Sequence, residues 1–413
     1  MRIKGIKKLK GEIKIPGDKS ISHRAVMIGS IAKGKTIVEN ILLSEDTLRT
    51  IECFREMGVE IDIDSKKNIL RINGNGLNGL KKPVNPLDCG NSGTTMRLLA
   101  GILVGQNFSS VLIGDNSLSN RPMDRIIIPL KKMGANIKGA MDKYPPLRIE
   151  PTDGLNGINY ELPVASAQVK SAILLASIYS KEKTKVIENK VTRDHTERML
   201  EYFGENQFSG KSVYVPGDVS SASFFIVAAT IIEGSSIMIK DVGLNPTRTG
   251  IIDVLKAMGG NIKVENIRNI NNEPLGDLYV SHSALKGIEL DRNIMGRLID
   301  EIPIIAVAAA FAEGTTIIRN AEELKYKETD RIKAMTKELK KMGADINELP
   351  DGLIIKGKKE LNAANVNTFN DHRIAMALSI AALNIRGESE IIESQCVNIS
   401  YPNFYEDIWR MEE

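Results

Sequence analysis

The chain has few of the residues that mark several large protein classes. Its 413 residues include three cysteines, Cys53, Cys89 and Cys396, which are widely spaced and odd in number. Such a set fits neither a disulfide framework nor the closely spaced ligands of a zinc site. We therefore expect free thiols, and no bound metal.

The net charge is also small, and long hydrophobic runs are few. A formal net charge of +3 is close to neutral for a chain of this length, which disfavours nucleic acid as a partner. The longest apolar run, near residues 304–312, is bounded by glutamates and too short to cross a bilayer. Residues 1–8 lack the apolar core of a signal peptide. We expect a soluble, reduced, cytoplasmic protein.

What the chain does contain is an internal repeat. An apolar helix, a Gly or Lys turn, a short β-rich run, a polar link and a second helix recur along it. Residues 33–40 and 313–320 are two copies of the turn and the β-rich run. A degenerate copy ends the chain near residues 387–409. The second helix of the other copies ends in Met-Gly or Phe-Gly, at Gly58, Gly134, Gly204, Gly259 and Gly343.

The first helix of each copy is predicted to be buried. Segments such as 224–232 and 302–312 are apolar on most sides, which is typical of a buried helix. Second helices such as 331–342 are amphipathic and should cover the outside. The first helices are predicted to begin near Ser20, Ser92, Ser166, Ser220, Asp300 and Asn370.

Length and repeat together predict an α/β protein with two similar domains. A chain of 413 residues exceeds one ordinary core, and its 42% hydrophobic and 26% charged residues suit a soluble globular protein. With three copies in each half, the N-terminal domain would span residues 18–216 and the C-terminal domain residues 1–17 plus 217–413. A first strand, over residues 4–15, would belong to the C-terminal domain.

The ends of the buried helices predict the position of a site. If these helices run parallel, their N-termini converge on a cleft between the domains. Each N-terminus carries about half a positive charge and unpaired N–H donors. The cleft would therefore bind anions before any side chain is considered.

Two motif matches do not fit their usual function. Residues 29–36 match the phosphate-loop pattern G-x-x-x-x-G-K-T, but the predicted helix precedes the loop and the strand follows it. Residues 74–79 match G-x-G-x-x-G, but Pro83 and Pro86 stand where a helix is required. Polar turns are favoured in both places.

The start of the first buried helix groups three polar residues. Lys19, Ser20 and Arg24 would lie within about one turn of each other. An arginine inside a helix built from Ala, Val, Met and Ile needs an anionic partner. A capped helix with solvated charges is the alternative.

The second buried helix and the link after it carry a similar pattern. Gly93 would let a ligand approach the backbone closely, and Asn91 or Ser92 can cap the helix. Arg121 precedes a proline in a rigid turn. A structural cap and a surface turn are the alternatives.

The C-terminal half carries a set of acids and bases at helix starts. The segments are Asp300-Glu301, residues 326–331 and residues 370–373. Carboxylates and guanidiniums at converging helix ends suit proton transfer beside bound anions. An ordinary capped helix start is the alternative for residues 326–331.

These motifs resemble the 5-enolpyruvylshikimate-3-phosphate (EPSP) synthase family of enolpyruvyl transferases. The resemblance runs in order along almost the whole chain and rests on residues 17–24, 90–97, 121–123, 327–331 and 370–373. It implies two inside-out α/β barrels with the active site in the cleft between them. It also implies enolpyruvyl transfer from phosphoenolpyruvate to shikimate 3-phosphate, through a tetrahedral adduct and without metal or cofactor, in a chain expected to be a monomer.

The resemblance also implies residue roles. Asp300 would accept the proton of the 5-hydroxyl as it attacks, while Glu328 or Lys19 helps to protonate the vinyl methylene. The shikimate 3-phosphate contacts would be Ser20, Arg24, Ser166, Gln168 and Lys327. The phosphoenolpyruvate contacts would be Lys19, Gly93, Arg121, Arg331 and Arg373.

Three positions depart from the family pattern. Ala167 stands where many members have a second serine, and Thr192, followed by Arg193, stands where they have a serine. Many members also carry a phosphoenolpyruvate-binding lysine shortly before a C-terminal aromatic-Pro pair. Here the pair is Tyr401-Pro402, and no lysine follows Glu390.

Two rival functions are weighed. UDP-N-acetylglucosamine enolpyruvyl transferases typically carry a reactive cysteine before the Arg-Pro turn, where this chain has residues 115–119 without one; Cys89 is interpreted as a packed thiol. A non-catalytic phospholigand-binding scaffold would need the basic residues but not both Asp300 and Glu328. Retention of both carboxylates favours the enzyme.

Overall fold

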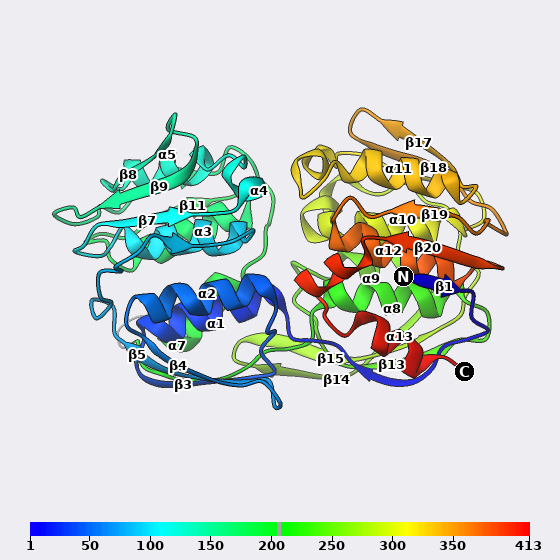
Figure 1. Cartoon of the computed structure of the whole chain (residues 1–413), viewed down its shortest axis with the longest axis horizontal. Helices are drawn as coiled ribbons and strands as arrows, with labels where there is room; N and C mark the ends of the chain where they lie inside the picture. The colour runs from blue at the N-terminus through cyan, green and yellow to red at the C-terminus, as the bar shows by residue number, and fades with distance from the viewer. Residues whose placement is uncertain (205–207) are drawn as a thin grey trace. The chain divides into compact units, whose positions relative to one another are not determined.

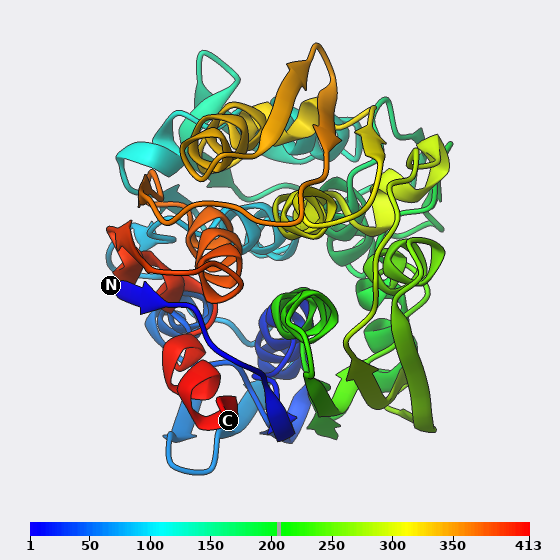
Figure 2. The ribbon, with the colours of Figure 1, turned by 90° about the vertical axis from the view of Figure 1, so that its right-hand side faces the viewer.

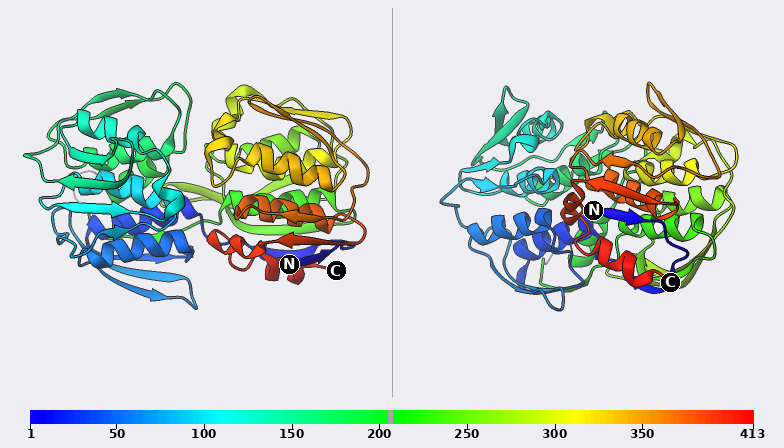
Figure 3. Two further views of the ribbon diagram at one scale, coloured as in Figure 1. Left: turned by 45° about the horizontal axis from the view of Figure 1, so that its top comes forward. Right: turned by 45° about the vertical axis from the view of Figure 1, so that its right-hand side comes forward.

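The computed structural model describes residues 1–204 and 208–413, which form two compact units. The N-terminal unit comprises Gly17–Val215 and Ile270–Glu273. The C-terminal unit comprises Met1–Pro16, Pro216–Asn269 and Pro274–Glu413. Both chain termini belong to the C-terminal unit, as Figure 3 shows.

Among the described residues, three inner helices form the centre of each unit, and most of them are labelled in Figure 1. All 13 residues of α8 are buried, and α10 is buried along its whole length, because neither helix has a polar face to turn to solvent. Figure 2 looks almost along the inner helices of the C-terminal unit. The prediction of buried first helices is confirmed. Their bounds are α1 Lys19–Ile31, α3 Gly93–Leu103 and α6 Ala167–Ser177 in the N-terminal unit, and α8 Val219–Ile231, α10 Ile302–Ala310 and α12 His372–Leu383 in the C-terminal unit.

Amphipathic helices cover the outside of each unit. Five of them are followed by glycines with φ of +80° to +97°, a backbone conformation that favours glycine over residues with a Cβ. This explains why the repeat closes on Met-Gly or Phe-Gly. The outer helices are α2 Glu45–Glu56, α5 Asp124–Lys132 and α7 His195–Phe203 in the N-terminal unit, and α9 Gly250–Ala257, α11 Arg331–Lys341 and α13 Phe404–Met411 in the C-terminal unit.

The described residues of the N-terminal unit form three sheets. Their orders are β12-β3-β5-β4, β6-β7-β9-β8 and β10-β11. The short helix α4 (Asn116–Ser119) follows β7. The strands are β3 Lys33–Glu39, β4 Glu60–Asp64, β5 Ile69–Asn75, β6 Leu87–Asp88, β7 Ser110–Ile113, β8 Asn136–Ala140, β9 Tyr144–Glu150, β10 Asn159–Glu161, β11 Lys185–Ile187 and β12 Ser212–Tyr214.

The C-terminal unit also contains three sheets. Their orders are β14-β15-β13-β2, β16-β18-β17 and β1-β20-β19. The strands are β1 Arg2–Lys4, β2 Lys10–Lys14, β13 Ser236–Gly243, β14 Asn261–Ile270, β15 Glu273–Ser281, β16 Thr315–Ile318, β17 Asp345–Leu349, β18 Gly352–Lys356, β19 Asn365–Asn367 and β20 Glu388–Ile392. Four 3-10 segments complete it: η1 Arg292–Arg297, η2 Ile299–Glu301, η3 Glu322–Tyr326 and η4 Ser394–Ile399.

Strand pairing explains how the chain enters each unit. The strands before and after an inner helix pair in parallel, as β6 with β7, β10 with β11, and β19 with β20. Two copies exchange partners: β2, before α1, pairs with β13, and β12, before α8, pairs with β3. The chain therefore crosses over twice, once before α1 and once before α8.

The prediction of one strand over residues 4–15 is wrong. The chain forms β1, antiparallel to β20, and then β2, parallel to β13. Between them, a Cβ at Gly5 would lie 2.0 Å from the carbonyl oxygen of Ile385. Only glycine allows this approach, so the backbone can leave one sheet and join the next.

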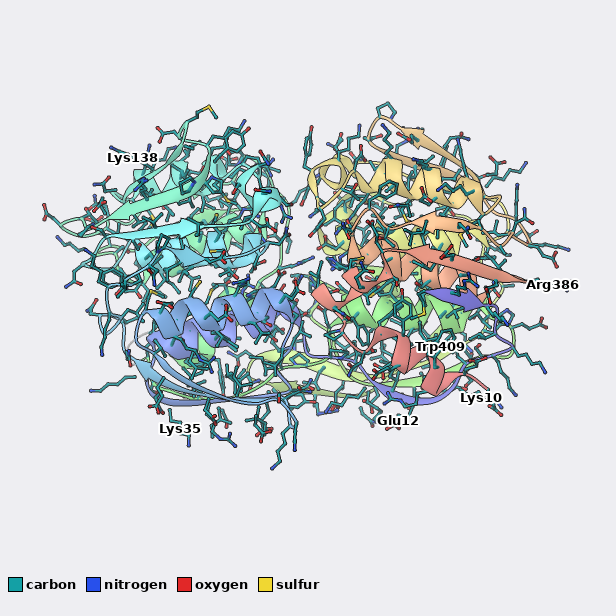
Figure 4. The ribbon with its side chains drawn as sticks, in the orientation of Figure 1. Lys10, Glu12, Lys35, Lys138, Arg386 and Trp409 are labelled. Carbon is teal, nitrogen blue, oxygen red and sulfur yellow. The ribbon has the colours of Figure 1, made fainter. Side chains whose placement is uncertain are left out.

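Charged side chains mark the exterior of both units. Lys35, Lys138 and Arg386 are exposed and point away from the folded chain in Figure 4. Among the described residues, none of the helices has both the length and the apolar character of a membrane span. Buried charged side chains are thus the exception, and several of them lie at the inner-helix N-termini.

Candidate active site

Lys19 and Ser20 lie at the start of α1, the first inner helix of the N-terminal unit. Asp18 caps α1 by accepting a hydrogen bond from the Ile21 N–H at 2.9 Å. Lys19 is in the first turn, where its Nζ lies 3.0 Å from Asp46 Oδ2 on α2. This ion pair ties the first turn of α1 to the outer helix.

Arg24 lies one turn further along α1 and is 3% exposed. Its Nε donates to Thr196 Oγ1 at 2.7 Å, its Nη2 to Ser171 Oγ at 2.7 Å, and its Nη1 to the Ser20 carbonyl at 2.8 Å. Burial lowers the pKa of Arg24 to about 10, although the charge of Glu197 acts in the opposite direction. The guanidinium is held by neutral oxygens, so its positive charge remains available to an anion.

Gly93 begins α3, directly after its cap Ser92, whose side chain accepts from the Thr95 N–H. A Cβ at Gly93 would lie 2.8 Å from Arg97 Nη1 and 3.7 Å from Arg121 Nη1. The bare backbone of Gly93 therefore lies beside two guanidiniums at a helix N-terminus. Such an arrangement favours an anion.

Arg121 and Gln168 are fixed by partners on neighbouring segments. Arg121 Nη2 donates to Asn91 Oδ1 at 2.7 Å and to Ser117 Oγ at 3.2 Å. Gln168 Oε1 accepts from Arg97 Nη1 at 2.6 Å, and its Nε2 donates to Thr94 Oγ1 at 3.0 Å. The N-termini of α3 and α6 are thereby linked through Gln168.

A chain of hydroxyls connects α1 to the start of α3. His23 Nδ1 lies 2.7 Å from Thr50 Oγ1, which lies 2.7 Å from Thr95 Oγ1. Thr95 in turn donates to the cap Ser92 at 2.7 Å. Burial lowers the pKa of His23 to about 3, outweighing the attraction of Asp46 for its protonated form. His23 is thus neutral at pH 7 and serves as a structural member of this network.

Ser166 caps α6, where its hydroxyl accepts from the Val169 N–H at 3.5 Å. One turn on, the buried Lys170 Nζ lies 2.9 Å from Glu188 Oε2 and 2.7 Å from Glu197 Oε1. Thr192, at one departure from the family pattern, donates its hydroxyl to Glu188. Lys170 therefore anchors the segment that supplies Thr196 to Arg24.

Arg331 is the centre of a carboxylate cluster in the C-terminal unit. Arg331 is the first residue of α11, and its side chain is 2% exposed. Nε and Nη2 donate to Asp371 at 2.8 and 3.3 Å, and Nη2 also donates to Glu328 Oε2 at 2.6 Å. Nη1 lies 3.4 Å from Asp300 Oδ1. Burial alone would lower the pKa of Arg331, but the charges of Asp371, Glu328 and Asp300 outweigh it and raise the pKa.

Asp300 has two basic neighbours. Lys327 Nζ lies 3.4 Å from its Oδ1, at the same distance as Arg331 Nη1, and donates to Glu323 Oε1 at 2.6 Å. Burial works to lower the pKa of Lys327, but Asp300 and Glu323 raise it overall. The structure thus brings Asp300, Lys327, Glu328 and Arg331 together.

Arg373 completes the predicted set in this unit. It lies in the first turn of α12, whose cap Asp371 accepts from the Arg373 N–H at 2.9 Å. Its Nη1 donates to the Asp300 carbonyl at 3.1 Å and lies 3.5 Å from Glu301 Oε1. Arg373 is therefore held against the residues that precede α10.

The segment without the family's lysine is packed into the core. Tyr401 is fully buried and donates its hydroxyl to Asp407 at 2.6 Å. Its ring lies 5.6 Å from that of Phe404, centroid to centroid. Burial raises the pKa of the nearby Cys396 thiol to about 11, so this cysteine is protonated at pH 7.

Sequence reasoning assigned no role to several residues that hold the site residues in place. Asp371 for Arg331, Thr196 for Arg24 and Asp46 for Lys19 are examples. Asp371 caps α12, whereas Thr196 and Asp46 lie in the first turns of α7 and α2. The partner of each is 27 to 172 residues away. These pairs can therefore be identified only from the folded structure.

Comparison with known proteins gives a consistent result. A family model described as EPSP synthase (3-phosphoshikimate 1-carboxyvinyltransferase) matches residues 3–408. A 3-phosphoshikimate 1-carboxyvinyltransferase of Thermoanaerobacter sp. (strain X514) is 53% identical over 411 residues, covering 96% of each chain. The corresponding protein of Geotalea uraniireducens (strain Rf4) is 51% identical, covering 97% of this chain and 96% of its own.

Solved structures share the fold. A structure of EPSP synthase from Acinetobacter baumannii has a TM-score of 0.90 and 44% identity, covering 99% of this chain and 97% of that one. The enolpyruvyl transferase NikO from Streptomyces tendae has a TM-score of 0.80 at 17% identity, covering 99% and 96%. The predicted fold class is confirmed.

Proposed function

The chain belongs to the EPSP synthase family, and we propose that it transfers the enolpyruvyl group of phosphoenolpyruvate to shikimate 3-phosphate. In this reaction the 5-hydroxyl oxygen attacks C2 of phosphoenolpyruvate while the methylene carbon takes a proton, giving a tetrahedral adduct. Loss of a proton from the methyl group and departure of inorganic phosphate then form the enol ether. The chain must therefore bind two phosphorylated anions and move protons.

We assign shikimate 3-phosphate to residues mainly of the N-terminal unit. Arg24 and Ser20 would bind the phosphate, with Ser166 and Gln168 at the start of α6, and Lys327 would contribute from the C-terminal unit. The support is the charge of Arg24, whose hydrogen-bond partners in the described part of the chain are neutral oxygens. A hydrogen bond to a charged group contributes about 1.5–3 kcal/mol, whereas a helix N-terminus contributes about 0.3–1 kcal/mol. Side chains would thus supply most of the affinity.

We assign phosphoenolpyruvate to cations of both units. Lys19, Arg121 and the backbone of Gly93 would bind from the N-terminal unit, and Arg331 and Arg373 from the C-terminal unit. The support in the first unit is the pair of guanidiniums beside Gly93. In the second unit it is the fixed geometry of both arginines.

Asp300 is the proposed acceptor of the 5-hydroxyl proton, and Glu328, with Lys19, the proposed proton donor to the methylene. The observation that carries the enzymatic function is that both carboxylates share one guanidinium: Arg331 lies 3.4 Å from Asp300 and 2.6 Å from Glu328. A scaffold that only bound anions would gain nothing from two acids placed where they repel its ligand.

The same reasoning extends to the state of the protein. We propose a monomer, because one chain supplies every residue of the assigned set. We also propose a cytoplasmic location, since Cys53, Cys89 and Cys396 are all free and buried thiols, as expected of a reducing compartment.

Phosphate release tests the function directly. The purified protein is mixed with phosphoenolpyruvate and either shikimate 3-phosphate or UDP-N-acetylglucosamine, with each substrate alone as the control. Release is expected only with shikimate 3-phosphate. Release with the nucleotide sugar would overturn the substrate, and release with neither would favour the binding scaffold.

A further inference from the structure

A row of buried polar side chains is linked to Arg373, and no role has yet been given to it. Arg248 follows β13 and is 3% exposed, Ser220 is in the first turn of α8 and is 2% exposed, and Glu301 directly precedes α10 and is 1% exposed. They come from three separate segments of the C-terminal unit. Burial of this many polar groups has a cost unless they satisfy one another.

Hydrogen bonds join these groups into one line. Arg248 Nη2 donates to Ser220 Oγ at 2.5 Å and to Asp218 Oδ1 at 3.1 Å. Ser220 donates its own hydroxyl to Glu301 Oε1. The same Glu301 oxygen lies 3.5 Å from Arg373 Nη1. The row therefore connects the N-terminal ends of α8, α10 and α12.

Arg373 and Arg331 differ in how many carboxylates hold them. Arg331 contacts Asp371, Glu328 and Asp300, so it retains two if one is lost. In the described chain, Glu301 is the one carboxylate that contacts the guanidinium of Arg373. The other contact is the neutral carbonyl of Asp300 at 3.1 Å. The orientation of Arg373 should therefore depend on Glu301.

We propose that Glu301, supported by Ser220 and Arg248, is a positioning residue that orients Arg373 for phosphoenolpyruvate. The inference rests on the proposed function, in which Arg373 binds this substrate. Glu301 itself does not touch substrate; it holds the guanidinium of Arg373 in place, next to the Asp300 carbonyl. Preorganisation of this kind lowers the cost of ordering a long side chain when the ligand binds.

Two opposite effects of Glu301 make the proposal testable. Its negative charge draws Arg373 into place, but the same charge weakens the attraction of Arg373 for an anion. If orientation dominates, loss of the charge weakens phosphoenolpyruvate binding. If simple electrostatics dominates, loss of the charge strengthens it. The sign of the change decides between them.

The test compares Glu301→Gln with wild type and with Glu338→Gln. Glu338 is also a buried glutamate of this unit, but it lies on α11 and accepts from the Asn367 N–H at 2.9 Å, outside the row. Glu301→Gln should raise KM for phosphoenolpyruvate about tenfold, the difference between a charged and a neutral hydrogen bond. The dissociation constant of shikimate 3-phosphate and kcat should change less than threefold. Glu338→Gln should leave KM unchanged.

Lower or unchanged KM in Glu301→Gln, at normal thermal stability, would overturn the proposal. Equal loss in KM, kcat and shikimate 3-phosphate affinity would also overturn it, because that pattern indicates general damage. If Glu301→Gln does not fold, Ser220→Ala replaces it, since the hydroxyl that fixes Glu301 is then absent. A smaller rise in the same KM is expected, and no rise refutes the role.

A crystal structure of Glu301→Gln separates this inference from the proposed function. Arg373 should leave the position it occupies beside the Asp300 carbonyl. If Arg373 stays, the positioning role is wrong even in an active enzyme. If wild-type protein releases no phosphate from either substrate pair, the proposed function fails. The position of Arg373 in the crystal structure of Glu301→Gln then still decides the role of Glu301.

Discussion

The buried imidazole of His23 predicts a defined sensitivity to acid. His23 is fully buried on α1, its Nδ1 lies 2.7 Å from Thr50 Oγ1, and its Nε2 has no hydrogen-bond partner in the described chain. Burial lowers its pKa from 6.5 to about 3, against the attraction of Asp46 and with the repulsion of Lys19. The folded chain therefore keeps this side chain neutral over a range in which the unfolded chain protonates it.

The size of the effect follows from proton linkage. Below pH 6.5 the unfolded chain binds a proton at this position, and the folded chain does not until the pH approaches 3. The folded pKa of a base is depressed, so its contribution to stability is present above pH 6.5 and is lost as the pH falls. Between pH 6.5 and 4.5 this one group should remove about 2 kcal/mol from the free energy of unfolding.

Urea unfolding at these two pH values, followed by circular dichroism, measures the effect. His23→Asn keeps an amide that can bond to Thr50 but does not titrate, so its stability should fall by about 2 kcal/mol less than that of wild type. His282→Asn is the matched control, because His282 is exposed whereas His23 is fully buried. Equal losses in wild type and His23→Asn would refute the assigned burial and the neutral state.

Two further substitutions test the proposed site. Asp300→Asn should lower kcat by about 10²–10⁴-fold while both substrates still bind, because an amide cannot accept the hydroxyl proton; near-normal turnover in a steady-state assay would remove Asp300 from the mechanism. Arg24→Ala should weaken shikimate 3-phosphate binding by about 10–100-fold and phosphoenolpyruvate binding much less, since a charged hydrogen bond is lost; calorimetry showing the opposite order would assign Arg24 to the other substrate.

The inner helices were predictable from sequence because they lack a polar face. Segments such as 224–232 and 302–312 are apolar all round, and they coincide with the C-terminal part of α8 and with α10, each running one or two residues past the helix end. The glycines that close the outer helices were equally visible, since a positive φ requires a particular residue type. In both cases the signal is local, so the sequence carries it without knowledge of distant contacts.

Strand pairing was less predictable, because the partner of a strand is not encoded beside it. Residues 4–15 read as one β-rich run, yet β1 and β2 join different sheets. The break depends on the close approach of Gly5 to the carbonyl of Ile385, a residue 380 positions away in the printed sequence. Local propensity cannot contain that information.

In the candidate site, too, local features could be predicted from sequence and contacts between distant residues could not. Residue types were readable: Lys19 and Arg24 at one helix start, and Asp300 at another. Their partners were not, since Thr196 reaches Arg24 from 172 residues away and Ser171 from 147. These contacts arise only when the inner helix α6, which carries Ser171, and the outer helix α7, which carries Thr196, pack beside α1. The assigned roles remain predictions for the experiments above.

Arg24 and Arg331 are held in opposite ways, and this difference has a functional consequence. The hydrogen-bond partners of Arg24 are neutral oxygens, and burial lowers its pKa to about 10 against the attraction of Glu197, so a bound anion would further stabilise this buried charge. Three carboxylates surround Arg331 and raise its pKa, so an anion approaching it must compete with charges already in place. Arg24 should therefore contribute mainly to affinity, whereas Arg331 should mainly fix the positions of Asp300 and Glu328. For this reason Arg24→Ala is best examined by binding and Asp300→Asn by turnover.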